Sequence, residues 1–189
     1  MIRHLLCLMF LLLSCFAFSQ AGIQFMGGLS SAQNENLEVT PEGSSHSGYF
    51  FGADAALNQG KMFFIIGAQY HKLSFEAQTT KNYFSVENPM NWFKLRFGLG
   101  FQLFQISDDI KVKAKTLASI NALVSYPENF NPEPYHIYNS SVAAIALGLG
   151  LEFKSISFEL GYDIGFFNAV NKIENSKFDF LTASLGFKI

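Results

Sequence analysis

The sequence predicts an all-β protein, an eight-stranded antiparallel up-and-down barrel that spans a membrane. Three observations lead there: apolar and polar residues alternate in eight segments, short and long connections alternate between them, and the apolar positions carry bulky side chains. Composition agrees, because 49% of the 189 residues are apolar and 22 are Phe, whereas 15% are charged. An average soluble domain is about 25% charged. The net charge of −2 gives no basic excess, so we predict no nucleic-acid partner.

The first 19 residues, 1–19, have the features of a secretory signal peptide. A basic start precedes an apolar run over residues 5–18, and small residues just before Gln20 fit a cleavage site there. The run is shorter than the roughly 20 residues that a membrane-spanning helix needs. Lipidation at Cys15 is an alternative, which the apolar residues after that cysteine disfavour. Cleavage before Gln20 removes both cysteines and leaves one domain, residues 20–189.

Alternation places successive side chains on opposite faces of a strand, and it identifies the strands here. In residues 156–166, Ile, Phe, Leu and Tyr occupy one face, while Ser, Glu, Gly and Asp occupy the other. The eight predicted strands are residues 23–30, 49–57, 62–70, 92–103, 110–126, 143–153, 156–166 and 181–189.

The connections between these strands differ systematically in length. The short connections are residues 58–61, 105–109 and 154–155, and the longer ones are residues 31–47, 74–91, 127–139 and 168–177. Short turns at one end and longer loops at the other are typical of transmembrane barrels, whose turns face the periplasm and whose loops face the outside.

Side-chain size indicates which face of the wall points outward. A soluble barrel around a ligand would turn its apolar face inward. An eight-stranded barrel, however, has an interior that side chains just fill, so we expect small residues to line it. Most of the 15 glycines lie on the polar face, and Phe, Leu and Ile dominate the other face. The bulky face is therefore predicted to point outward, with outer-membrane lipid as its partner.

Charged residues of the predicted strands all share the inner face. They are Asp54, Lys94, Arg96, Lys111, Lys113, Lys115, Glu152, Glu159, Asp163 and Lys188. Two clusters stand out among them: a basic one of Lys94, Arg96, Lys111, Lys113 and Lys115, and an acidic one of Glu152, Glu159 and Asp163. Buried charges require partners, so we predict a salt-bridge network that fills the lumen. The alternative is an anion-selective path, which makes the protein a narrow channel for small solutes.

The long connections carry aromatic residues of the kind that form contact surfaces. The candidates for contact with partner membrane or surface proteins are Phe75, Tyr83, Phe84, Phe130, Tyr135 and Tyr138. The alternative is that these loops pack over the mouth of the barrel.

The signal peptide, the eight alternating strands and the ending Leu185-Gly186-Phe187-Lys188-Ile189 resemble a known family. It is the small outer-membrane β-barrel family that includes PorT-like proteins and, more distantly, the OmpX and OmpA transmembrane type. The ending looks like the C-terminal signal that the outer-membrane assembly machinery reads, although it closes on Ile189 rather than on an aromatic residue. The resemblance implies secretion to the periplasm, a place in the Gram-negative outer membrane, and a structural or accessory role in an outer-membrane complex.

No set of residues in the sequence gives a strong indication of catalysis. His71, Ser74 and Glu76 could form the catalytic set of a lipid-modifying outer-membrane hydrolase, but one short stretch seldom supplies the required geometry. The four histidines are scattered, which disfavours a metal site. Residues 98–100 and 148–150 read Gly-Leu-Gly, but no predicted helix follows them, so they are not nucleotide-binding loops. We expect a non-enzymatic protein without a cofactor or metal.

Overall fold

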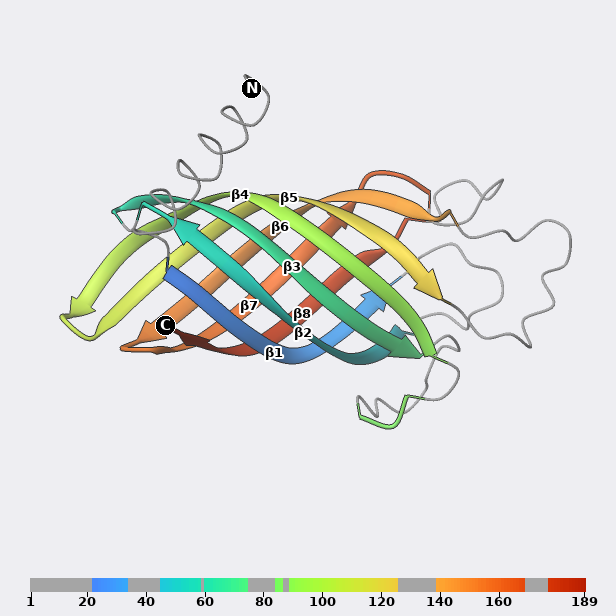
Figure 1. The fold of residues 1–189 in the computed structure, drawn as a ribbon, viewed down its shortest axis with the longest axis horizontal. Helices are drawn as coiled ribbons and strands as arrows, with labels where there is room; N and C mark the ends of the chain where they lie inside the picture. Colours follow the sequence, from blue (N-terminus) through green and yellow to red (C-terminus); the bar gives the residue numbers. More distant parts are fainter. Residues whose placement is uncertain are drawn as a thin grey trace, which may run out of the picture.

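The computed structural model describes residues 22–33, 45–58, 60–74, 84–86, 89–125, 139–168 and 177–189. Eight strands form a closed antiparallel barrel in which each strand pairs with its neighbours in the sequence and β1 pairs with β8 (Figure 1). They are β1 (Gly22–Gln33), β2 (Ser45–Leu57), β3 (Met62–Ser74), β4 (Pro89–Ser107), β5 (Ile110–Ser125), β6 (Ser141–Phe153), β7 (Ile156–Gly165) and β8 (Asp179–Lys188). Within the described ranges there is no helix with the length and apolar character needed to span a bilayer. The predicted fold class is confirmed.

Several strands run further than alternation predicted. β4 continues to Ser107 instead of residue 103, so the predicted connection 105–109 shrinks to a turn of Asp108 and Asp109. Register shifts interrupt the ladder of β4 and β5 between Gln102 and Phe104 and again before Ser107. A bulge breaks the period of two while pairing continues, which is why the pattern alone ended the strand too early.

The short turns lie at the end of the barrel where β1 begins and β8 ends, on the left in Figure 1. Asn58 and Lys154 in these turns have φ angles of 60° and 54°, in the left-handed region that tight hairpin connections use. The main-chain N–H of Ile189 donates to the carbonyl oxygen of Ile23 at 2.9 Å, which continues the closure of β8 on β1 to the last residue.

The outer face of the barrel is apolar. Along β6, Leu147, Leu149 and Leu151 are 47%, 53% and 45% exposed, whereas Ala144 and Ala146 are buried. Other exposed apolar side chains of the wall include Phe25, Ile66, Phe97, Leu160, Leu185 and Phe187. The alternation of the sequence therefore separates an apolar outer face from a buried inner face. The face with bulky apolar side chains points outward, as side-chain size predicted.

Large side chains also enter the lumen, which corrects the expectation that small residues line it. The buried aromatic side chains are Phe50, Phe63, Trp92, Phe178 and Phe180. A Cβ atom on Gly100 would collide with the ring of Phe63 on the neighbouring strand β3. Glycine on one strand therefore makes room for an aromatic ring from the next, and small and large residues fill the interior together.

Candidate functional site

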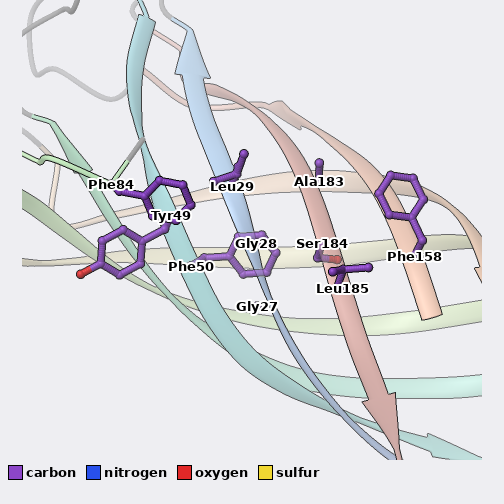
Figure 2. A pocket seen from close by; sticks show the side chains of 10 residues that line it. All are labelled: Gly27, Gly28, Leu29, Tyr49, Phe50, Phe84, Phe158, Ala183, Ser184 and Leu185. Atoms are coloured by element: carbon purple, nitrogen blue, oxygen red, sulfur yellow. The ribbon is translucent and has the colours of Figure 1, made fainter. Parts of the chain in front are cut away.

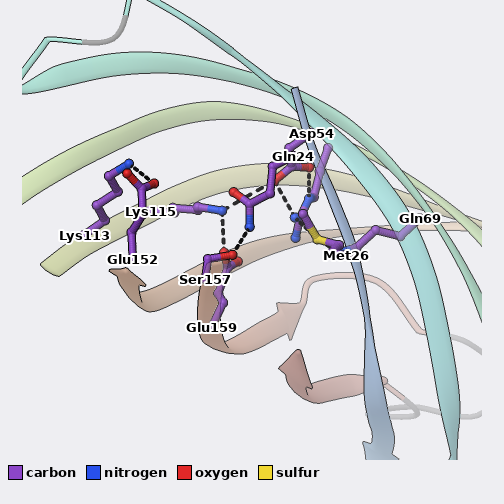
Figure 3. A network of polar contacts seen from close by, with 10 residues as sticks. Gln24, Met26, Asp54, Gln69, Lys113, Lys115, Glu152, Ser157 and Glu159 are labelled. Atoms are coloured by element: carbon purple, nitrogen blue, oxygen red, sulfur yellow. Dashed lines mark hydrogen bonds and ion pairs between the residues drawn. The ribbon is translucent and has the colours of Figure 1, made fainter. Parts of the chain in front are cut away.

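Charged side chains from β2, β4, β5, β6 and β7 meet inside the barrel (Figure 3). Arg96 on β4 donates to Asp54 on β2 through two hydrogen bonds, from Nε to Oδ1 at 2.8 Å and from Nη2 to Oδ2 at 2.6 Å. Such bidentate pairing is the strong geometry between a guanidinium and a carboxylate. Because β3 lies between β2 and β4, this pair spans the inner surface of β3.

Lys115 on β5 extends this pair to the opposite wall. Its Nζ donates to Glu159 on β7 and also lies 3.4 Å from Oδ2 of Asp54. Beside it, Nε2 of Gln24 on β1 donates to Oγ of Ser157 on β7 at 2.7 Å. These contacts join strands that are not neighbours in the sheet, so they brace the barrel across its lumen.

A second ion pair lies nearer the long-loop end. Nζ of Lys94 donates to Oδ2 of Asp163 at 2.6 Å, and both side chains are almost fully buried. The same Nζ lies 4.7 Å from the centroid of the Phe180 ring. A desolvated ammonium is stabilised by both a carboxylate and an aromatic face, so Lys94 joins the charged part of the lumen to its aromatic part.

Toward the short turns, Lys113 donates to Glu152, and Nζ of Lys188 lies 3.9 Å from Oε1 of Glu152. Lys111 lies opposite Glu152 in the register of β5 and β6, but no ion pair joins it to another described residue within 4 Å. The structure therefore brings seven of the eight charges of the two predicted clusters into ion pairs and leaves Lys111 outside them.

Asp54 is one of two charged residues of this network, with Lys188, that neither predicted cluster contained. Alternation places it on the inner face of β2, but each predicted cluster groups charges on adjacent strands only. Its partners Arg96 and Lys115 lie on β4 and β5. An electrostatic argument could have identified Asp54. It is an acidic residue on the inner face of β2, and the register of β2, β3 and β4 places it at the same depth of the barrel as Arg96 of the basic cluster.

A small cavity lies within the network, with a volume of about 30 Å³. The residues that line it include Asp54, Lys113, Lys115, Glu152 and Lys188. A polar cavity of this volume is large enough to hold water.

The long-loop end of the lumen is filled by an apolar cluster, which we call the aromatic plug. It consists of Ala32, Leu73, Met90, Trp92, Val142, Phe178 and Phe180, all buried. The ring of Trp92 packs edge-on against Phe178 and Phe180, with centroids 6.0 Å and 6.3 Å apart. The plug therefore covers the network on the side that faces the long loops.

The structure gives His71, one residue of the candidate hydrolase set, partners other than Ser74. Nδ1 of His71 lies 3.0 Å from Oγ of Ser30, and the ring of His71 stacks on Phe50 at 4.8 Å. In the amide orientation that satisfies both neighbours, Gln69 donates to Nε2 of His71 and accepts from Arg96.

This orientation of the Gln69 amide implies one tautomer of His71. With Gln69 donating to Nε2, the ring proton lies on Nδ1, and His71 donates to Ser30. Ser30 and His71 are both fully buried. Glu76, the third residue of the candidate set, lies outside the described residues.

Of the predicted loop contact residues, Phe84 is described, and its side chain is 77% exposed. Phe75, Tyr83, Phe130, Tyr135 and Tyr138 lie outside the described residues, as do residues 1–19 of the predicted signal peptide. Among the residues that the structure describes, no three His, Cys, Asp or Glu side chains are grouped as a metal ion would require.

The geometry defines the class of this protein as a closed eight-stranded antiparallel β-barrel with a filled lumen. No family model and no curated protein matches its sequence. Among solved structures, Neisserial surface protein A (NspA) is similar over 90% of this chain and 97% of its own, with a TM-score of 0.58 and 13% identity. Ail, the attachment invasion locus protein of Yersinia pestis, solved with the heparin analogue sucrose octasulfate, covers 89% and 97% at 13% identity and a TM-score of 0.47. The similarity to NspA shows a shared fold.

Proposed function

We propose that this chain is an outer-membrane β-barrel protein that acts without catalysis, as a structural or accessory subunit of an outer-membrane complex. The observation that carries the proposal is the outer wall, where apolar side chains are exposed on strand after strand. Leu95, Phe97, Leu149 and Leu185 are each about half exposed or more. An exposed apolar surface of this extent causes association in water but is stable against hydrocarbon.

The filled lumen supports a structural role over transport. Ion pairs occupy the part toward the short turns, and the aromatic plug occupies the part toward the long loops. Side chains of an eight-stranded barrel suffice to fill its interior. The narrow small-solute channel is the alternative function, and it requires a path through both the network and the plug.

The accessory role rests on the resemblance to PorT-like proteins and on the residues available for contact. Phe84 on the long-loop side is exposed, and aromatic side chains of this kind anchor protein interfaces. The turn of Lys154 and Ser155 at the other end offers two residues only. We therefore place a partner membrane or surface protein at the long loops or at the lipid-facing wall.

The lipid-modifying hydrolase is the other alternative. Ser30 and His71 bring a hydroxyl and an imidazole within 3.0 Å, but both are buried. In the Gln69 amide orientation that satisfies both neighbours, the proton of their hydrogen bond lies on the imidazole. A hydrolase needs a hydroxyl that a neighbouring base can deprotonate and that substrate can reach. Unaltered lipid A on overexpression is the expected result, and altered lipid A would favour the hydrolase.

Cell fractionation tests the proposed location. We expect the full-length chain, expressed in a Gram-negative host, to lose residues 1–19 and to appear in the outer-membrane fraction with Gln20 at its N-terminus. The barrel should run as a compact species on unheated gels and shift on boiling. An intact mass that retains Met1, acylation at Cys15, or a protein found in the periplasm would contradict the proposal.

Co-purification tests the accessory role separately from the location. The protein is extracted in mild detergent, and the proteins that remain bound are compared with those bound to a barrel whose long loops have been shortened. Partners bound to the wild type and lost from the shortened barrel are the expected result. The accessory role would be contradicted if every outer-membrane complex stayed unchanged both when the protein is deleted and when its long loops are shortened.

A further inference from the structure

A groove of about 550 Å³ runs over the outer face of the barrel where β8, β1 and β2 lie side by side (Figure 2). Phe158 and Leu185 lie at one end and Tyr49 at the other, with Leu29 and Ala183 between them. None of the residues that line the groove is charged. The groove is therefore an apolar depression in an otherwise bulky apolar wall.

Gly27 helps to form this depression, because it has no side chain to fill it. In the sheet, Gly27 lies between Phe51 on β2 and Leu185 on β8, which are 57% and 64% exposed. A Cβ atom on Gly27 would have a single neighbour within 4 Å, the main-chain oxygen of Phe50 at 3.6 Å, which is ordinary contact. Packing of the barrel therefore does not require glycine at this position.

The next residue shows the contrast. A Cβ atom on Gly28 would collide with the main chain of Ala183 on β8, so Gly28 is needed for the close approach of two strands. Gly27 differs, because the space it leaves opens on the outer face alone. The absence of a side chain at Gly27 therefore changes the shape of the outer face and not the packing of the lumen.

Phe84 lines the same groove from the connection between β3 and β4. With 77% of its surface exposed, its ring offers an apolar face that nothing in the described part of the chain covers fully. A ligand lying in the groove would contact the wall on one side and this ring on another. Phe84 was a candidate contact residue from the sequence, and its position here indicates the kind of contact.

We propose that this groove binds an acyl chain of a membrane lipid, an inference that rests on the proposed membrane location. The volume lies within the range of about 300–1,000 Å³ typical of pockets for small ligands. β1, β2 and β8 are paired on both sides in the closed barrel, so the groove offers no free main-chain edge to a partner strand. A flexible apolar chain needs neither a free edge nor a charge, and it fits an uncharged groove that is continuous with the lipid-facing wall.

Native mass spectrometry of the detergent-solubilised full chain, titrated with palmitoyl-oleoyl phosphatidylethanolamine, tests this proposal. We expect the first lipid to bind more tightly than the following ones. Gly27→Leu fills the groove and should weaken the first binding by about tenfold, as expected when about two methylene groups lose their contact. Ala118→Leu adds the same side chain on the exposed outer face of β5, away from the groove, and should leave the first binding unchanged.

Phe84→Ala provides a second variant that leaves every strand of the barrel intact, and it should weaken the first binding by a few-fold. Folding of each variant is checked by the gel shift on boiling. The proposal would be overturned if the folded Gly27→Leu barrel bound the first lipid as tightly as the wild type does. Equal affinity of the wild type for all lipids would also overturn it, as would a polypeptide bound in the groove. These outcomes are distinguishable from failure of the membrane location, which cell fractionation reports by itself.

Discussion

At the scale of single residues, one carboxylate inside the barrel forms ion pairs with two cationic side chains. Asp54 accepts two hydrogen bonds from Arg96 and lies 3.4 Å from Nζ of Lys115. Its side chain is 4% exposed. Charges removed from water are stabilised by close opposite charges and hydrogen bonds, so loss of one partner leaves the others unpaired in a buried place.

We therefore predict that Asp54→Asn lowers the free energy of unfolding by about 3–5 kcal/mol, the usual effect of breaking a buried ion pair. The reason is that Arg96 loses its bidentate acceptor while its own charge stays buried. Urea titration of the barrel in lipid vesicles measures the change.

Asp109→Asn is the matched control for this prediction. Asp109 lies 3.6 Å from Nζ of Lys154 in an ion pair whose side chains are more than half exposed. Exposed pairs contribute about 0–1 kcal/mol, so the control should stay close to the wild type. Equal destabilisation by the two variants would mean that the lumen network is not held by buried charge pairing.

Two neighbouring residues of β6 test the assignment of the two faces of the wall. Leu149 is 53% exposed on the outer face, whereas a Cβ atom on Gly150 would meet its nearest neighbours inside at 3.5 Å or more. We predict that Leu149→Arg costs about 2–4 kcal/mol in a bilayer and that Gly150→Ser is well tolerated. The folded fraction after refolding into lipid vesicles measures both, and equal losses would show that the faces are assigned wrongly.

At the scale of the elements, the wall depends on its ladders and not on the long loops. β5 and β6 pair continuously from Ile110 opposite Phe153 to Ala122 opposite Ser141. These hydrogen bonds close within the wall, and a closed barrel needs no other partner for its main chain. We therefore expect that folding does not require residues 127–139, which belong to the connection between these two strands.

Shortening residues 127–139 to a tight turn should leave the barrel folded and inserted, because the ladder of β5 and β6 remains. We expect it to impair the partner-dependent phenotype, since Phe130, Tyr135 and Tyr138 are lost with the segment. The gel shift on boiling measures folding, and comparison with the full deletion measures function. If the shortened variant folds and behaves as the wild type in every assay that is sensitive to the full deletion, this loop is not needed for the function.

At the scale of the whole molecule, the lumen is filled by two different chemistries in series. Ion pairs such as Arg96 with Asp54 occupy one part, and the aromatic plug around Trp92 occupies the other. Lys94 connects the two parts, with a carboxylate of Asp163 on one side and the ring of Phe180 on the other. The barrel thereby resembles a packed core surrounded by a wall, more than a pore.

We predict that the purified protein gives no reproducible open-channel currents in planar bilayers, because no solute larger than water passes both the network and the plug. A porin in the same membrane serves as the control. Stable conductance from this protein would overturn the prediction and favour the small-solute channel.

Much of the architecture is predictable from local pattern. The period of two identifies every strand and assigns Leu149 and Gly150 to opposite faces, because alternation is a property of each strand by itself. The ends of β4 were predicted less well, because the bulges near Gln102 interrupt the period while hydrogen bonding to β5 continues. Strand ends depend on the partner strand, which the pattern does not contain.

The sequence by itself determined the number of strands, their order and, along the regular part of each strand, the face on which a side chain lies. The tertiary structure decided which inner residues meet: that Asp54 pairs with Arg96 two strands away, that Phe63 lies over Gly100, and that Gly27 opens a groove beside Phe51 and Leu185. The physical reason is the stagger of a closed barrel. It sets the depth at which each strand crosses the lumen, and only residues at equal depth can touch across it.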